Sequence, residues 1–511
     1  MRERTEIIVV PHTHWDREWY EPFQRFRLRL VALLDDVFER MERDPRQRFT
    51  LDGQLAAVDD YLEVRPERRE QVVALVSAGR LAIGPWQILL DEFLCSGENI
   101  VRNLERGLTR SAELGGAMPV GYLPDMFGHI AQMPQILAGA GLAHACVWRG
   151  VPERVRTDAF AWEAPDGTVV RTEYLCESYG NAAGLMDDLR LVTRRATDLA
   201  GRLHAWRPDP DGGPMLGMYG TDHAAPSPDA PDMLAAAGVD DMRLRLGTLT
   251  EYFATRPTEV DGLPVVRGEL RSHARANILP GVISVRGHLK QAMSRAERRV
   301  ERYAEPLAAL SHDRSVQRFL DMAWTRLIDA SCHDSVTGCG CDETAEQVAA
   351  RLAEADQLGR AVCDLVGARL AAAVPRDGHL LLNPTPAPGP PWSRWTSRGR
   401  RRRGRGAGRH RRPSGFHPGP RPGPDAARRR PGCGGRTAGR AGPGSRLAAA
   451  VPRDGHLLLN PTPAPRTALV TLDVEGPAGA EAVGLADTDG HPVSTQVLDR
   501  ARTLLADDLV A

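Results

Sequence analysis

Two histidines and an acid alternate directly after the first apolar run of the chain. The run Ile7–Val10 leads to His12, His14 and Asp16. In an extended chain, side chains at positions i, i+2 and i+4 lie on one face, so two imidazoles and a carboxylate would point together. Imidazole nitrogens and carboxylate oxygens suit zinc. A lone His-x-His is more often a pair of hydrogen-bonded residues, so both interpretations stay open at this point.

Further polar clusters follow other predicted strands or lie in a helical region. In a barrel, residues that follow the C-terminal ends of the strands converge on one face, where active sites lie. Each cluster alone could instead be a helix cap, because Asp is a common N-cap residue. Several such clusters in one chain favour a shared site. They are Gly84–Gln87 with Asp91 and Glu92, Gly121–His129 with Asp125, Met218–His223 with Asp222, and Ser331–Ser335 with His333.

The elements that would position these clusters change in type along the chain. Up to about residue 260, short β-branched runs alternate with helical patterns, which predicts an α/β fold with a parallel sheet, open or closed into a barrel. We assign residues 1–260 to a (β/α) barrel-like catalytic domain. Residues 261–372 are predicted to form a three-helix bundle that completes the active site, because Leu289–Leu370 is helical in pattern with few β-formers. The start of a truncated all-β region follows.

A repeat interrupts that β region. Arg369–Pro388 recurs without change as Arg446–Pro465, and residues 389–446 hold 17 Arg and one acid. We interpret 389–446 as an out-of-frame, disordered copy of the DNA that encodes the segment after the second repeat. The alternative is an Arg-rich linker that binds RNA. On the frameshift interpretation, 373–388 begins the β region, 447–511 repeats that beginning, and the chain is truncated.

Length and composition exclude several classes of protein. The chain has 511 residues, of which 42% are apolar and 26% charged, enough for a substantial core. No run of about 18 uncharged apolar residues is present, which predicts no membrane partner. The four apolar residues Ile7–Val10 are too few for a signal peptide, and eight irregularly spaced cysteines indicate reduced thiols, so we expect a cytoplasmic protein. No nucleic-acid partner is expected, and a homo-oligomer is compatible with the sequence.

Taken together, these motifs resemble glycoside hydrolase family 38, the zinc-dependent retaining α-mannosidases, particularly its bacterial members. The resemblance covers residues 7 to about 370 and is carried by HTHWDREW at His12–Trp19, GPWQ…LDE, Asp125–His129 and HDSVTGC at His333–Cys339. It implies one Zn²⁺ per chain, with His12 a neighbour rather than a ligand. The ligands that it implies are His14, Asp16, Asp125 and His333.

The resemblance also implies an activity. The substrate would be an α-mannoside or a small mannose-containing glycoside, cleaved with retention through a covalent mannosyl-aspartate. Asp125 would be the nucleophile and Asp222 the general acid/base, since a retaining glycosidase uses two carboxyls about 5–5.5 Å apart. The side chains matching sugar-packing aromatics are Trp19 and Phe127, and those matching groups near the nucleophile and sugar hydroxyls are Arg149 and Asp334.

Three alternatives stay open. Within the family, the substrate could be mannosylglycerate or a similar small compound. The chain could also be an inactive truncated fragment, because family members have large β domains after the helical bundle and that part is interrupted here. A metal-dependent amidohydrolase likewise opens with His-x-His after its first strand, but that class uses metal-activated water and no carboxylate nucleophile; the Trp-Asp-Arg-Glu-Trp continuation and His333-Asp334 favour the mannosidase.

Overall fold

The chain divides into two compact units, residues 1–366 and 367–511, and the candidate site lies in the first. A computed structural model describes residues 5–207, 213–237, 242–311 and 314–372, and four short strands farther along the chain.

The strand that carries the first motif lies inside a five-stranded sheet. β1 (Thr5–Thr13) pairs in parallel with β2 (Phe49–Leu51), β8 (Met215–Tyr219) and β9 (Met242–Leu246), and β3 (Leu81–Ala82) extends the sheet beyond β2. The apolar run of β1 is fully buried, as expected for a parallel strand that is covered on both faces. The C-terminal end of this strand therefore leads its polar residues into the interior.

A second five-stranded sheet has the order β10 (Val265–Arg267), β6 (Ala159–Glu163), β7 (Val169–Tyr174), β5 (His144–Val147) and β4 (Gly121–Leu123). Only β6 and β7 are antiparallel. The mixed α/β class is thus confirmed. In the described part of the first unit the strands form two separately hydrogen-bonded sheets, where the sequence predicted one open or closed sheet.

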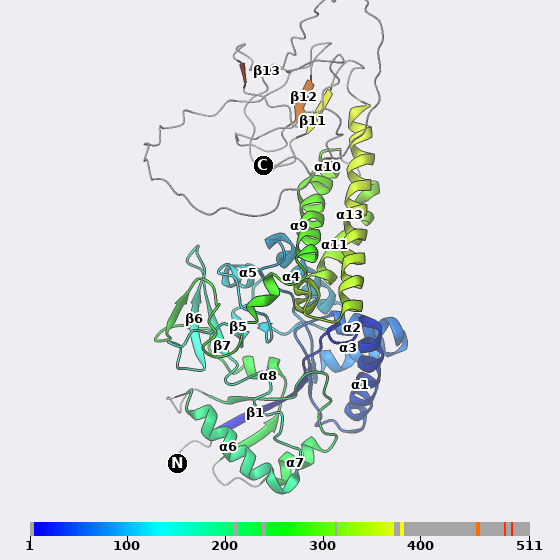
Figure 1. Cartoon of the computed structure of the whole chain (residues 1–511). Helices are drawn as coiled ribbons and strands as arrows, with labels where there is room; N and C mark the ends of the chain where they lie inside the picture. The colour runs from blue at the N-terminus through cyan, green and yellow to red at the C-terminus, as the bar shows by residue number, and fades with distance from the viewer. Residues whose placement is uncertain are drawn as a thin grey trace, which may run out of the picture. The chain divides into compact units, whose positions relative to one another are not determined.

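Helices cover these sheets (Figure 1). α1 has the buried stripe of an amphipathic helix, since Phe26, Leu30, Leu34 and Phe38 recur at spacings of four. None of the described helices combines the length and hydropathy needed to cross a bilayer. The helices are α1 (Phe23–Arg43), α2 (Ala56–Val64), α3 (Arg69–Ser77), α4 (Gly97–Ala112), α5 (Met133–Gly139), α6 (Val192–His204), α7 (Ala230–Ala236) and α8 (Leu249–Phe253), with short 3-10 turns at Pro66–Arg68, Leu189–Leu191, Pro280–Ile283 and Arg314–Val316.

Most of the described residues between Leu289 and Leu370, the segment predicted to be helical, lie in helices. Its long helices run side by side, joined by ion pairs from Arg299 to Asp356 at 2.5 Å and from Arg326 to Glu354 at 2.7 Å (Figure 1). The elements are α9 (Gly287–Arg299), the π-helical turn η4 (Val300–Ala304), α10 (Glu305–Leu310), α11 (Gln317–Ala330), α12 (His333–Thr337) and α13 (Asp342–Ala371).

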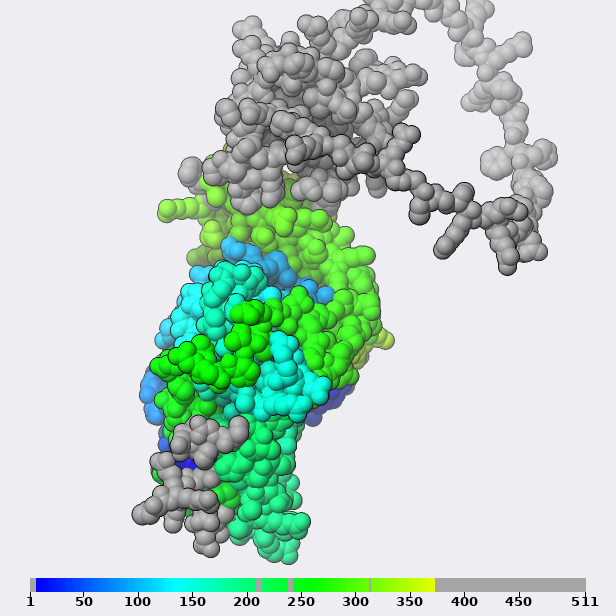
Figure 2. Space-filling view, turned by 90° about the vertical axis from the view of Figure 1, so that its left-hand side faces the viewer, coloured from blue at the N-terminus to red at the C-terminus, as the bar shows by residue number. Residues whose placement is uncertain are grey.

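The segment between the second sheet and α9 lies against the loops that follow β4 and β5. Figure 2 shows this green segment in contact with the cyan segment. Two isolated bridges join them, between Leu270 and His129 and between Ser272 and Gly150. The segment before α9 therefore holds the loop after β4, which contains Asp125, in place.

The second unit holds four short described strands. The two copies of the repeat pair with each other in parallel, through β11 (His379–Leu382) and β12 (His456–Leu459). β13 (Leu485–Ala486) and β14 (Pro492–Val493) are antiparallel. The predicted disordered segment 389–446 lies outside the described residues.

A buried acid links α9 to α4. Glu297 is 5% exposed and accepts hydrogen bonds from the Ser96 amide at 2.8 Å and the Asn99 side chain at 3.0 Å. Burial raises the pKa of Glu297 from 4.5 to about 7, against the effect of these donors. A raised carboxyl pKa means that the folded state holds the proton more tightly, so this contribution to stability is full below pH 4.5 and lost as the pH rises through 7.

We therefore expect Glu297→Gln, which cannot ionise, to gain stability relative to wild type as the pH rises from 4.5 to 8. The gain should reach up to about 3 kcal/mol, from 1.4 kcal/mol per pKa unit. Urea unfolding followed by tryptophan fluorescence at several pH values measures it. Glu301→Gln, on the next turn, is the control. A difference between Glu297→Gln and wild type that does not change with pH would contradict the prediction.

Candidate metal and catalytic site

The loops after β1 and β8 are held together by backbone hydrogen bonds. The His14 amide donates to Thr221 at 3.3 Å, and the His223 amide donates to the His14 carbonyl at 2.9 Å. His14 and Asp222 thus form an isolated parallel bridge just past the strand ends. Two of the polar clusters recognised in the sequence therefore meet at one edge of the sheet.

Two histidines and one acid from distant parts of the chain form a compact ligand group. His14 Nε2 lies 3.0 Å from Asp16 Oδ1, and His333 Nε2 lies 3.3 Å from the same oxygen. Ligand atoms of these three residues all lie within 4.8 Å of one another. His333 reaches them because α12 begins at this residue, after its amide donates to the Leu89 carbonyl at 3.0 Å.

The chemistry of this group fits a divalent metal ion. The three residues are at most 3% exposed, and His14 Nε2, Asp16 Oδ1 and His333 Nε2 have no hydrogen-bond partner in the described part of the chain. Buried polar atoms are normally paired, because leaving them unpaired costs free energy. Two imidazoles and a carboxylate that converge in this way are a donor set suited to zinc.

Asp125, just past β4, faces the same group. Its Oδ2 lies 4.0 Å from His14 Nε2 and 3.9 Å from His333 Nε2. Its Oδ1 accepts a hydrogen bond from Arg149 Nε at 2.7 Å, and the ion pair brings Arg149 Nη2 within 2.5 Å of the same oxygen. Asp125 therefore presents one oxygen to the histidines and the other to a guanidinium. It was expected as the fourth ligand, but the compact group of ligand atoms in the described residues consists of the other three.

Charges close to the histidines perturb their titration. Burial lowers the pKa of His14, but the carboxylates of Asp52 and Asp16 outweigh it, so the pKa lies well above its ordinary value. For Asp125, burial raises the pKa, and Arg149 opposes this effect only in part. Protons and a metal ion would compete for these atoms, because a metal binds neutral imidazole and ionised carboxylate.

His12 differs from His14 in its environment. Burial lowers the pKa of His12 to about 4, so its ring is neutral near pH 7. His12 does not belong to the group of three ligand atoms.

Asp222 has a phenol partner that the sequence did not suggest. The hydroxyl of Tyr179 donates to Asp222 Oδ1 at 2.8 Å. Burial raises the pKa of Tyr179, and the charges of Asp125 and Asp222 raise it further, which keeps the phenol protonated as a donor. The ring of Tyr179 also lies 5.1 Å from that of His14. Tyr179 thus stands beside both the ligand group and Asp222.

Three of the predicted substrate-binding residues border the ligand group. The ring of Phe127 lies 5.5 Å from that of His333. Arg149 contacts Asp125 as described and lies 5.6 Å from the centre of the Phe127 ring. Asp334 Oδ2 lies 3.6 Å from His333 Nε2, and Asp334 Oδ1 accepts from Cys339 Sγ at 2.8 Å.

Trp19 lies farther out. Its ring packs against the apolar core beneath α1 and lies 5.1 Å from the ring of Tyr20. The hydroxyl of Tyr20 in turn contacts His223 Nδ1 at 3.1 Å. Trp19 is thus connected to the site through Tyr20, and the structure does not bring it into the ligand group itself.

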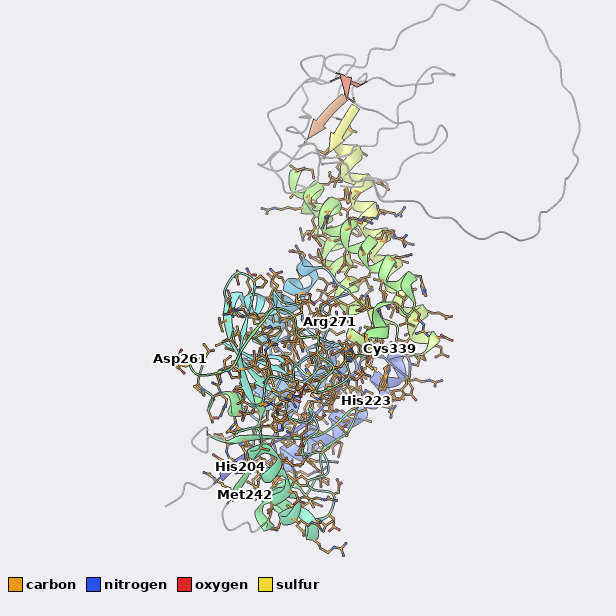
Figure 3. The ribbon with its side chains drawn as sticks, turned by 60° about the vertical axis from the view of Figure 1, so that its left-hand side comes forward. His204, His223, Met242, Asp261, Arg271 and Cys339 are labelled. Carbon is orange, nitrogen blue, oxygen red and sulfur yellow. The ribbon has the colours of Figure 1, made fainter. Side chains whose placement is uncertain are left out.

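His223, like Tyr179 and Asp52, was absent from the predicted site residues. His223 Nε2 lies 3.4 Å from Asp16 Oδ2. Figure 3 shows His223 and Cys339 in the region where the sheets meet the long helices, while Asp261 lies at the outer edge. The sequence contains an indication of His223, because this residue directly follows Asp222 in the polar Gly-Thr-Asp-His stretch. Tyr179 had no comparable signal.

Comparison with known proteins agrees with this arrangement. Residues 4–269 match the N-terminal domain of the glycosyl hydrolases of family 38. A protein of Halalkalibacterium halodurans, provisionally named a mannosylglycerate hydrolase, is 33% identical over 67% of this chain and 40% of its own length. Human alpha-mannosidase 2C1 is 24% identical over 74% of this chain and 36% of its own length.

A solved structure, that of an alpha-mannosidase from Enterococcus faecalis, is also similar. It has 32% sequence identity and a TM-score of 0.69, over 73% of this chain and 44% of the other. The chain spans less than half the length of each of these relatives.

Proposed function

Because the chain belongs to glycoside hydrolase family 38, we propose that it hydrolyses terminal α-mannosidic bonds with retention, assisted by one zinc ion. The observation that supports this most strongly is the buried group of His14, Asp16 and His333 facing Asp125. A carboxylate beside a metal-ligand set, with a second carboxyl held by a phenol, offers the parts that retaining hydrolysis needs.

In this proposal Asp125 attacks the anomeric carbon, and the bond to the leaving oxygen breaks as Asp222 gives that oxygen its proton. Water, deprotonated by Asp222, then displaces Asp125 and releases the sugar. Arg149 holds the attacking carboxylate in orientation, and Tyr179 does the same for Asp222. Zinc held by His14, Asp16, Asp125 and His333 would orient sugar hydroxyls and stabilise charge in the transition state.

The same proposal assigns the sugar-binding side chains. Phe127 would pack on the sugar, since its ring already borders His333. Asp334 would accept a hydrogen bond from a sugar hydroxyl. Burial raises the pKa of Asp334 to about 8, against the effect of His333. Trp19 would contribute to sugar binding at the edge of the site, through its ring contact with Tyr20.

We further propose that the catalytic domain ends near residue 260 and the helical bundle near residue 372. We also propose that the protein is cytoplasmic and that a mannoside is its binding partner. The name of the H. halodurans relative favours mannosylglycerate as a second candidate substrate.

Release of sugar from an aryl α-mannoside and from mannosylglycerate, with and without added zinc, tests the activity. We expect mannose from at least one substrate, and loss of the reaction after chelation. An amidohydrolase would release no sugar from either compound. No release from a folded, zinc-loaded chain would favour the inactive-fragment alternative.

Replacement of Asp222 is expected to separate substrates by leaving group. For Asp222→Ala, substrates with poor leaving groups should slow by about 10²–10⁴-fold, because they need protonation, and activated aryl mannosides far less. Steady-state rates on a series of aryl mannosides measure this, and azide should rescue the activated substrate. Equal losses across the series would assign the proton transfer elsewhere.

A further inference from the structure

Asp52 lies behind the ligand His14, on the side away from the metal group. It follows β2, is fully buried and has a positive φ of 47°. Its Oδ2 lies 3.1 Å from His14 Nδ1. The same oxygen accepts hydrogen bonds from the Trp15 amide at 3.1 Å and from Gln54 Nε2 at 3.0 Å. Two donors and the Nδ1 atom of the His14 ring thus converge on one carboxylate oxygen.

Gln54 connects this carboxylate to the second histidine. Its Nε2 also donates to the Trp15 carbonyl at 2.8 Å, and its Oε1 accepts from the Leu89 amide at 3.3 Å. The Leu89 carbonyl lies 3.3 Å from His333 Nδ1. The Nδ1 atoms of His14 and His333 therefore each face an acceptor, and Gln54 contacts the residues that carry both acceptors.

We propose that Asp52 and Gln54 are positioning residues, which hold the rings of His14 and His333 so that both Nε2 atoms face the metal group. An acceptor at Nδ1 places the ring proton there and leaves the Nε2 lone pair free for a metal. A carboxylate acceptor also makes the imidazole a stronger ligand. The inference rests on the proposed zinc site.

A purely structural role for Asp52 would explain less. A residue at a strand end could accept from the Trp15 amide alone, and Asp tolerates a positive φ better than most residues. That role does not account for the approach of the His14 ring to the same oxygen. It also gives no reason for a buried Gln54 that contacts Asp52 and the Leu89 amide together.

The test is zinc affinity, measured by competition with a fluorescent chelator, together with the visible spectrum of the Co²⁺-loaded protein. Asp52→Asn removes the charge and keeps an acceptor, while Gln54→Met removes the connection between the two acceptors. The matched control is Glu173→Gln, because Glu173 is a buried carboxylate, 2% exposed, that pairs with Arg171 at 3.0 Å away from the ligand group. All variants are compared at the same folded fraction, measured by circular dichroism.

We expect Asp52→Asn to bind zinc about 10–100-fold more weakly than wild type, with Gln54→Met weakened in the same direction. Both should change the Co²⁺ spectrum, and Glu173→Gln should change neither the zinc affinity nor the spectrum. Wild-type affinity and spectrum in Asp52→Asn, or an equal loss of affinity in Glu173→Gln, would overturn the inference without contradicting the proposed zinc site. Absence of zinc binding by the wild-type protein would overturn both.

Discussion

His14→Ala is expected to lose its zinc during dialysis that leaves the wild-type protein with one equivalent. His14 Nε2 is one of three buried ligand atoms within 4.8 Å of one another, so the variant keeps only two of the three. Loss of a direct ligand should exceed the roughly 10–100-fold cost of losing a residue behind a ligand. Metal analysis by mass spectrometry measures the stoichiometry.

The matched control for that variant is His144→Ala, because His144 is also a buried histidine but lies in β5, with its ring 5.3 Å from that of Phe253. It should keep its zinc. Equal zinc content in wild type and His14→Ala would contradict the assignment of His14 as a ligand. Equal loss in both variants would indicate general unfolding rather than a removed ligand.

Asp125→Ala is expected to lower kcat for an activated aryl α-mannoside by at least about 10⁴-fold, since both the nucleophile and one metal-facing oxygen are removed. Asp125 contacts Arg149 and faces both histidines, and no other carboxylate among the assigned residues has this combination of contacts. Stopped assays with zinc in excess measure the rate.

Azide separates the roles of the two carboxylates by product stereochemistry. In Asp125→Ala, azide should attack the anomeric carbon directly and give the β-mannosyl azide. In Asp222→Ala, azide should displace Asp125 from the sugar and give the α-mannosyl azide. The opposite pattern would exchange the two assignments, and a rate loss below about tenfold in Asp125→Ala would remove Asp125 from the reaction.

The sequence predicted the parts of the site that follow local pattern. The apolar run before His12 is a buried parallel strand, and the clusters with Asp125, Asp222 and His333 meet near its end. Strand geometry explains the meeting of the clusters after β1 and β8, because the C-terminal ends of parallel strands share one edge of a sheet. Asp125 follows a strand of the other sheet and His333 begins α12, so their approach depends on contacts between distant segments.

The remaining features depend on contacts between distant segments. Tyr179 and Asp52 were not predicted, since neither lies in a polar motif and their roles arise from packing against Asp222 and His14. The division of the strands into two sheets was not predicted either, because strand periodicity does not specify which strands pair. Trp19 belongs to the recognised motif, yet its ring packs on the apolar core under α1.

The most direct test of a retaining mechanism at Asp125 is covalent trapping with a mechanism-based fluorinated mannosyl reagent, followed by peptide mass spectrometry. The fluorine slows hydrolysis of the glycosyl-enzyme more than its formation, so the adduct accumulates. We predict one sugar per chain, attached to Asp125 in the peptide that spans Pro124–His129. An adduct on another residue, or turnover that gives the inverted sugar with no adduct, would contradict the account.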